Sequence, residues 1–228
     1  MSPSWSSIML LADGRFPSGS YAHSSGLEAA VHGGLIRGEV SAFIAARLET
    51  IARCEAAIAV AARRGAAGED IAMLLALDDE AQARCSSPPL RQAASRLGSQ
   101  LLRTAATVWP ASTIVSGYRS ASASTPRPVA FGVVACAAGL EAEPAAAAIL
   151  YDDAASVVSA AVKLLPVDPA LATRWLADSG PTIDAIARAL ASLPAREADP
   201  AALPAPFAPL LETRSIVHAA EDRRLFAS

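Results

Sequence analysis

The chain is poor in the residues on which most catalytic and metal sites are built. Its three cysteines are far apart, none belongs to a CxxC pair, and none has a histidine at metal-ligand spacing. The GxSxG elbow of serine hydrolases is missing. Gly14 and Gly19 have the spacing of a phosphate-binding loop, but Ser20 stands where that loop needs lysine. We therefore assign no catalytic, cofactor-binding or metal-ligating residue, and expect the thiols to be small buried side chains.

Positive charge and aromatic side chains are also scarce. The net charge is −3, and every basic residue except Lys163 is a dispersed arginine, so the basic stripe needed for nucleic-acid binding is absent. Aromatic residues make up 5% of the chain, and the apolar excess is largely alanine. Alanine is the best helix former, whereas Val, Ile and Thr are too sparse for an all-β fold. The composition predicts an all-α protein.

Long hydrophobic runs are missing too. The best charge-free runs are 104–118, which contains Pro110, and 128–140, which is short and rich in Ala and Gly. A spanning helix needs roughly 20 apolar residues, so both runs favour buried helices and no membrane association. The N-terminus MSPSWSSIML has no basic region before its apolar stretch, which argues against a signal peptide. We expect a cytoplasmic protein.

Helical periodicity and Pro/Gly punctuation predict a single compact domain of about eight to ten helices with short connections. Five prolines in residues 194–209 predict an extended connector between a body, 1–193, and a C-terminal helix and tail, 210–228. Gly98, inside a helix, predicts a close helix–helix contact. The expected helices are Glu39 to Arg64, Glu69 to Arg84, one after Ser87-Pro88-Pro89, Val129 to Gly139, Glu143 to Leu165, and two after Asp168-Pro169 and Gly180-Pro181.

Residues 10–36 look most like a functional site. Ser20 is the expected N-cap of a short helix that places Tyr21 and His23 in its first turn, ending at Gly33-Gly34. Glu28 shares a face with Ser24 and with His32, and Gly26 predicts close approach of another helix. One hypothesis is an all-helical enzyme using His23 and Glu28 for acid–base chemistry, although no third group is placed to orient the histidine.

Metal binding by these histidines is a further hypothesis. His23 and His32 are nine residues apart, too far to bind one ion from a single helix. A symmetric dimer is one arrangement that can bring two copies of His23 or of Glu28 together, while a hydrogen-bonded structural histidine is the simpler interpretation. His218, near the C-terminus, has the same two interpretations.

The C-terminus pairs Leu225 and Phe226 with two preceding arginines, which is unusual because chain ends are normally polar and frayed. One interpretation is a tail that folds back on its own core. The other is a docking peptide with Leu and Phe as anchors and Arg224 making bidentate contacts on a partner.

Four stretches, in order, resemble the urease accessory protein F (UreF) family. LLADGRFPSGSYAHSSGLEAAV is similar to its N-terminal signature, and the segment from Pro88 to Arg103 to its helix with an internal glycine. The block from Pro128 to Leu165 looks like the most recognisable part of the family pattern, and the ending RRLFAS resembles its Arg-Leu-Phe/Tyr terminus. Where the family commonly has His-x-Pro-Val, this chain has Pro126-Arg127-Pro128-Val129.

The resemblance implies an all-helical, non-enzymatic component of a nickel metallochaperone. Such proteins bind UreD (called UreH in some systems), form a dimer at the centre of the assembly, and recruit the GTPase UreG to load nickel into apo-urease. Nickel is then handled by the complex, and no cofactor is stably bound. By position, the resemblance implies these partner-binding residues: Tyr21, His23, Glu28, Arg224, Leu225 and Phe226.

Overall fold

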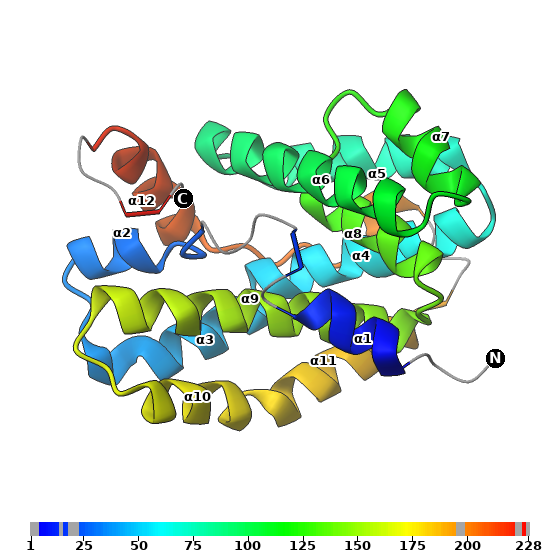
Figure 1. Ribbon diagram of the computed structural model, residues 1–228. Coiled ribbons are helices and arrows are strands. Elements are labelled where there is room, and N and C mark those ends of the chain that lie inside the picture. The colour runs from blue at the N-terminus through cyan, green and yellow to red at the C-terminus, as the bar shows by residue number, and fades with distance from the viewer. Residues whose placement is uncertain (1–4, 14–15, 18–22, 195–198, 222–224, 227–228) are drawn as a thin grey trace.

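The computed structural model describes residues 5–13, 16–17, 23–194, 199–221 and 225–226 (Figure 1). These residues form an all-helical fold without strands, as the composition predicts. Ten of the helices have nine or more residues, which confirms the expected eight to ten, and α1 and α2 are shorter. The helices are α1 (Trp5–Ala12), α2 (Leu27–His32), α3 (Val40–Glu49), α4 (Ile51–Ala67), α5 (Ile71–Ala83), α6 (Pro88–Val108), α7 (Thr113–Ala121), α8 (Arg127–Ala137), α9 (Ala142–Leu164), α10 (Pro169–Asp178), α11 (Gly180–Ala191) and α12 (Pro209–Ala219), with single 3-10 turns at Arg37–Glu39 and Pro200–Ala202.

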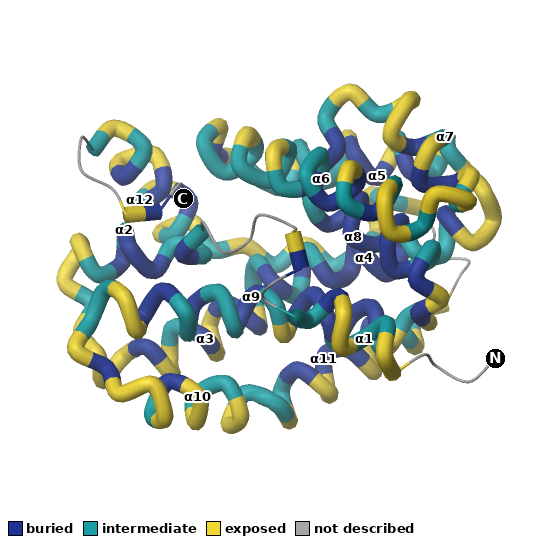
Figure 2. The backbone as a smooth tube through the Cα atoms, in the orientation of Figure 1, coloured by how far each residue is buried: buried dark blue, intermediate teal, exposed yellow. Residues whose placement is uncertain are grey.

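The core lies where α4, α8 and α9 meet, and the buried residues gather on their facing sides (Figure 2). Helix α8 is buried from Pro128 through Ala135. A Cβ at Gly132 would overlap the carbonyl oxygen of Ala59, so the backbones of α4 and α8 are in direct contact. A Cβ at Gly98 would likewise overlap the Thr125 carbonyl oxygen, so the backbone does approach closely there, but the neighbour is the loop before α8 and not the predicted helix.

Helix α9 is the only helix among the described residues that is long and apolar enough to cross a membrane. However, 56% of its most apolar stretch is buried inside the protein. It packs against α4, α10, α11 and α1, so it is the central core helix that the sequence predicts.

One long helix predicted from the sequence is wrong. The stretch from Glu39 to Arg64 is divided at Thr50, whose ψ of −102° is not helical. The Thr50 hydroxyl donates to the carbonyl oxygen of Ala46 at 2.7 Å, so the side chain satisfies an acceptor at the end of α3. The apolar stripe continues across the break because α3 and α4 pack on the same core, and periodicity alone therefore does not reveal it.

The Pro-rich segment lies against α5. The Arg84 guanidinium donates to the carbonyl oxygens of Pro200 and Pro204, at 2.7 and 3.2 Å. The segment leads into α12, which packs against α2 and α6 (Figure 1). Helix α12, near the C-terminus, therefore lies beside α2, near the N-terminus.

Candidate functional site

The backbone before α2 differs from the predicted capped helix. Residues 18–22, including Ser20 and Tyr21, lie outside the described residues, and His23 precedes the helix, which begins at Leu27. Ser25 and Gly26 have φ values of 51° and 80°, so a left-handed turn starts α2. Gly26 is needed for that turn rather than for close packing, because a Cβ there would be 3.7 Å from Leu211, an ordinary contact distance.

Glu28 is a buried carboxylate, 1% exposed, that holds the C-terminal end of the chain. Its Oε1 accepts the backbone N–H of Leu225 at 2.7 Å, and its Oε2 accepts the backbone N–H of Phe226 at 3.0 Å. The Nε2 atom of His218 lies 2.9 Å from the same Oε2. Hydrogen bonds to a carboxylate are stronger than neutral ones, so this group fixes the tail against α2. We call Glu28, His218, Leu225 and Phe226 the tail latch.

The two apolar side chains of the tail point in different directions. Phe226 is 6% exposed and belongs to the hydrophobic core, and the Lys163 amine lies 5.1 Å from its ring centroid. Leu225 is 73% exposed. The tail therefore folds back on the body, and in this position a partner has access to Leu225 but not to Phe226 or Glu28. Arg224 lies outside the described residues.

A second polar contact lies beside the tail latch. The Nδ1 atom of His32, in the last turn of α2, is 2.8 Å from Oε2 of Glu221, just after α12. The ring centroids of His32 and His218 are 6.0 Å apart. Glu28 and His32, which were predicted to share a helical face, both contact the C-terminal segment: Glu28 contacts His218, and His32 contacts Glu221.

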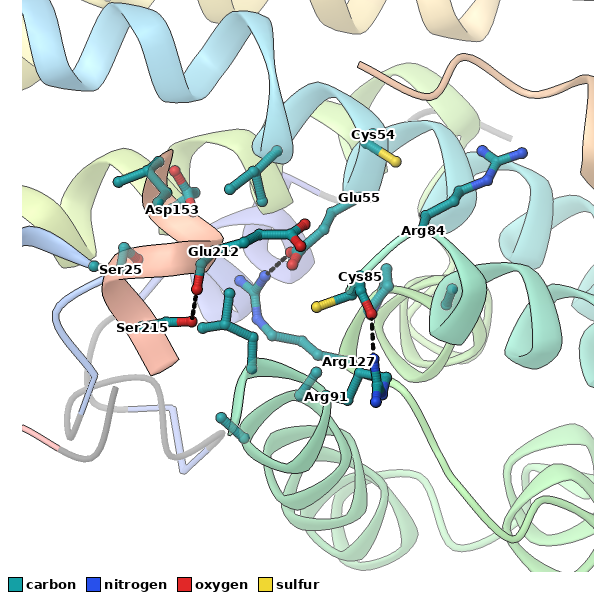
Figure 3. Close-up of a pocket in the computed structure, with 18 of the residues that line it drawn as sticks. Ser25, Cys54, Glu55, Arg84, Cys85, Arg91, Arg127, Asp153, Glu212 and Ser215 are labelled. Atoms are coloured by element: carbon teal, nitrogen blue, oxygen red, sulfur yellow. Dashed lines mark hydrogen bonds and ion pairs between the residues drawn. The ribbon is translucent and has the colours of Figure 1, made fainter. Parts of the chain in front are cut away.

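A cavity of about 160 Å³ lies between α4, α6, α8 and α12, and its largely apolar lining includes several charged side chains (Figure 3). Arg127 donates to Glu55 at 2.6 Å and to Asp152 at 2.5 Å. Arg47 makes a bidentate contact with Asp153, at 3.0 and 2.5 Å. These ion pairs join the consecutive helices α3 and α4 to α8 and α9.

The α12 side of the cavity is joined to α6 by hydroxyl groups. The hydroxyl of Ser87, the N-cap of α6, lies 2.6 Å from the Ser215 hydroxyl. Ser215 also donates to the Glu212 carbonyl oxygen (Figure 3). The Ser86 backbone N–H and hydroxyl both donate to the Glu212 carboxylate. These contacts orient α12 so that its far end reaches Glu28.

Burial and ion pairing shift the pKa values of the charged side chains beside the cavity. Burial disfavours the charged form of Arg47, but Asp153 outweighs it and raises the arginine pKa. The pKa of Arg127 is also raised, because Glu55 and Asp152 outweigh the cost of burial. Burial raises the pKa of Glu55 in spite of Arg127. Both arginines therefore stay charged at neutral pH.

His23 lines this cavity, whereas Glu28 does not. Burial, followed by the charges of Arg127 and Arg96, lowers the pKa of His23. Glu28 is instead paired with His218 and with two backbone N–H groups. A buried carboxylate whose two oxygens both accept hydrogen bonds is poorly placed to exchange protons with a substrate, so the geometry does not support the His23–Glu28 acid–base hypothesis.

The ion pairs of Arg47 and Arg127 beside the cavity were not predicted from the sequence. A signal was present, because Asp152 and Asp153 lie in the middle of the most apolar long helix, where acidic residues are rarely buried unless paired. Arg47 similarly sits beside Leu48 on the apolar stripe of α3. The pairing of Arg47 with Asp153, which are 106 residues apart, is not visible in the sequence.

Fold and site together define a class: an all-α protein built on a central α4–α8–α9 packing, with its C-terminal tail clamped to an N-terminal helix. The sequence profile of the UreF family matches residues 37–180. Two relatives named urease accessory protein UreF, from Mycobacterium sp. (strain JLS) and Mycobacterium marinum, are 31% and 33% identical, each over 97% of both chains. A third of that name, from Mycobacterium bovis, is 36% identical over 73% of this chain and 75% of its own. The chain belongs to the UreF family.

Proposed function

We propose that this chain is a non-catalytic scaffold of urease maturation, which binds UreD (UreH) and recruits the GTPase UreG so that nickel reaches apo-urease. Nickel is cargo of the complex in this proposal, and the chain carries no stably bound cofactor of its own. It works in the cytoplasm as a homodimer within the assembly, and it changes the GTP hydrolysis of UreG.

The observation that carries the proposal is the tail latch. Glu28 holds the backbone of the last described residues, Phe226 anchors them in the core, and Leu225 remains 73% exposed. An ordered chain end with an outward apolar side chain is a surface that a partner can recognise, because the cost of ordering it has already been met within the chain. Tyr21, His23 and Arg224 complete the proposed recruiting face, by family resemblance.

The test is co-expression of the chain with its cognate UreD and UreG, followed by isolation of the complex. The three chains are expected to copurify, and deletion of residues 224–228 is expected to remove UreG while leaving UreD bound. Leu225→Ser is expected to weaken UreG retention without loosening the latch, since Glu28 binds backbone atoms there.

Val108→Ser is the matched control, because Val108 is also an exposed apolar residue, 42% exposed. It ends α6, roughly 30 Å along the helix from the Ser87 end that contacts α12. Full UreG retention by both the deletion and Leu225→Ser would refute the role of the tail. A chain that retains neither UreD nor UreG would refute the scaffold itself.

The enzyme alternative has its own test. The purified chain without partners is expected to convert no substrate to product. Substitution of His23 is expected to affect complex formation only. Light scattering coupled to gel filtration measures whether the isolated complex contains two copies of the chain.

A further inference from the structure

Three side chains with metal-ligating atoms meet where α2 and α12 end. One ligand atom from each of His32, His218 and Glu221 lies within 4.8 Å of the other two, and among the described residues no second group of this kind is found. The closest pair, His32 Nδ1 and Glu221 Oε2, is 2.8 Å apart. Ligand atoms about 2.1 Å from a tetrahedral ion lie roughly 3.4 Å apart, so small rotamer changes bring all three to coordinating distance.

Glu28 prepares His218 for such a role. Its carboxylate engages Nε2 of His218 at 2.9 Å, and the two side chains are only 3% and 2% exposed. A histidine that binds a metal through one ring nitrogen usually donates the other to a carboxylate, which fixes the ring and strengthens it as a ligand. With Nε2 engaged by Glu28, Nδ1 is the ring nitrogen of His218 that remains for an ion.

The remaining two ligands sit at the surface. The side chains of His32 and Glu221 are 42% and 32% exposed, so an ion has an entry path and exchange with solvent is open. Two imidazoles and one carboxylate suit borderline ions such as Ni²⁺ and Zn²⁺, whereas Mg²⁺ and Ca²⁺ prefer oxygen ligands alone. Three protein ligands leave a coordination position for water or for a donor from another molecule.

We propose that His32, His218 and Glu221 form an exchangeable site for a borderline divalent transition-metal ion, which joins α2 to the C-terminal segment. The ion replaces the direct contact between His32 and Glu221 and sits next to the tail latch. Metal binding therefore strengthens the hold of α2 on the chain end that carries Leu225. Sequence spacing concealed the site, because His32 and Glu221 are 189 residues apart.

The test uses the untagged full-length chain without partners, titrated with Ni²⁺, Zn²⁺ and Mg²⁺ by calorimetry. One Ni²⁺ or Zn²⁺ per chain is expected, and no Mg²⁺. The variants His32→Ala and Glu221→Gln are each expected to lose more than about a hundredfold in affinity, beyond the range typical of changes outside the first shell of ligands. Both positions are partly exposed, so the variants are expected to fold.

Glu49→Gln is the matched control, since Glu49 is an exposed glutamate paired with Arg53 on the neighbouring α-helix. It is expected to bind metal as the wild type does. Co²⁺ serves as a spectroscopic probe: d–d bands without a thiolate-to-metal charge-transfer band are expected, because no cysteine takes part. Hydrogen exchange at Leu225 and Phe226 is expected to slow on metal addition.

Equal binding by the wild type and His32→Ala overturns the proposal, as does a thiolate band with Co²⁺ or binding of Mg²⁺ as tight as that of Ni²⁺. Because no partner is present, these outcomes are independent of whether the chain recruits UreD or UreG.

Discussion

Replacing Glu28 by glutamine tests whether one carboxylate holds the chain end. Gln is nearly isosteric with Glu but has a single acceptor oxygen. If that oxygen takes the Oε2 position, it keeps Phe226 N–H and His218 but turns an amide N–H₂ toward Leu225 N–H. If it takes the Oε1 position, the amide can donate to His218 Nε2, but Phe226 N–H loses its acceptor. Either orientation leaves one backbone N–H without its acceptor, and the neutral amide makes no charge-assisted hydrogen bond.

The magnitude follows from the burial of Glu28, which is 1% exposed. A hydrogen bond to a charged group contributes about 1.5–3 kcal/mol to stability. With 1.4 kcal/mol per factor of ten, the open population of the tail rises roughly 10- to 150-fold. Helices α4, α8 and α9 make none of these bonds, so their stability falls by much less.

Native-state hydrogen exchange measures the effect directly. The amides of Leu225 and Phe226 are expected to lose protection by that factor in Glu28→Gln, while amides of α4, α8 and α9 keep theirs. Glu49→Gln, a surface glutamate, is the control and should change neither set.

Two results would refute the reasoning. Unchanged protection at Phe226 would mean that the Phe226 side chain alone fixes the tail. An equal loss of protection in α8 would mean that the tail is an inseparable part of the body rather than a locally opening segment.

Three further predictions follow from other parts of the fold. Gly98→Ala forces a Cβ against the Thr125 carbonyl oxygen, so we expect about 3 kcal/mol lower unfolding free energy by urea denaturation. Asp153→Ala leaves the Arg47 guanidinium charged and buried, and should cost about 3–5 kcal/mol in the same assay. Burial raises the pKa of Cys85 from 9.0 to about 11, so at pH 8 it should be alkylated about a hundredfold more slowly than an unperturbed thiol, with the rate still rising with pH towards 11.

Each of these has a control in the chain. Gly38→Ala adds a Cβ with no neighbour within 4 Å and should leave stability nearly unchanged. Glu49→Gln breaks an exposed pair with Arg53 and should cost at most about 0.5 kcal/mol. Alkylation of Cys85 in urea should reach the rate of a free thiol. The burial argument would be contradicted if Asp153→Ala lowered the unfolding free energy no more than Glu49→Gln does. It would also be contradicted if Cys85 in the folded chain were alkylated as fast as a free thiol.

Helix boundaries marked by proline or glycine were predictable from the sequence. Ser87-Pro88-Pro89 and Asp168-Pro169 both cap helices as expected, because a side-chain acceptor followed by proline satisfies the first turn. The break at Thr50 was not predictable, since no glycine or proline marks it. The start of α2 was misplaced because two successive positive-φ residues, Ser25 and Gly26, delay the helix beyond the expected Ser20.

The site was predictable only in outline. Residues 10–36 and the chain end were both singled out, and family resemblance linked them to partners. That Glu28 contacts Phe226 across 198 residues, or that Arg127 joins Glu55 to Asp152, depends on tertiary packing that periodicity does not encode. Glu28 illustrates the limit, because family resemblance implied a partner-binding role for a side chain that is buried against its own chain.

The tail latch recognises main-chain atoms, which has a consequence for how this end of the chain can vary. Glu28 binds the amides of residues 225 and 226 and is indifferent to the side chain at 225, so that outward position can change to follow a changing partner while the closed geometry persists. Position 226 is different, because Phe226 is also held by its side chain, which is 6% exposed in the hydrophobic core. Variation at this end of the chain is therefore free at the outward position and restricted at the buried one.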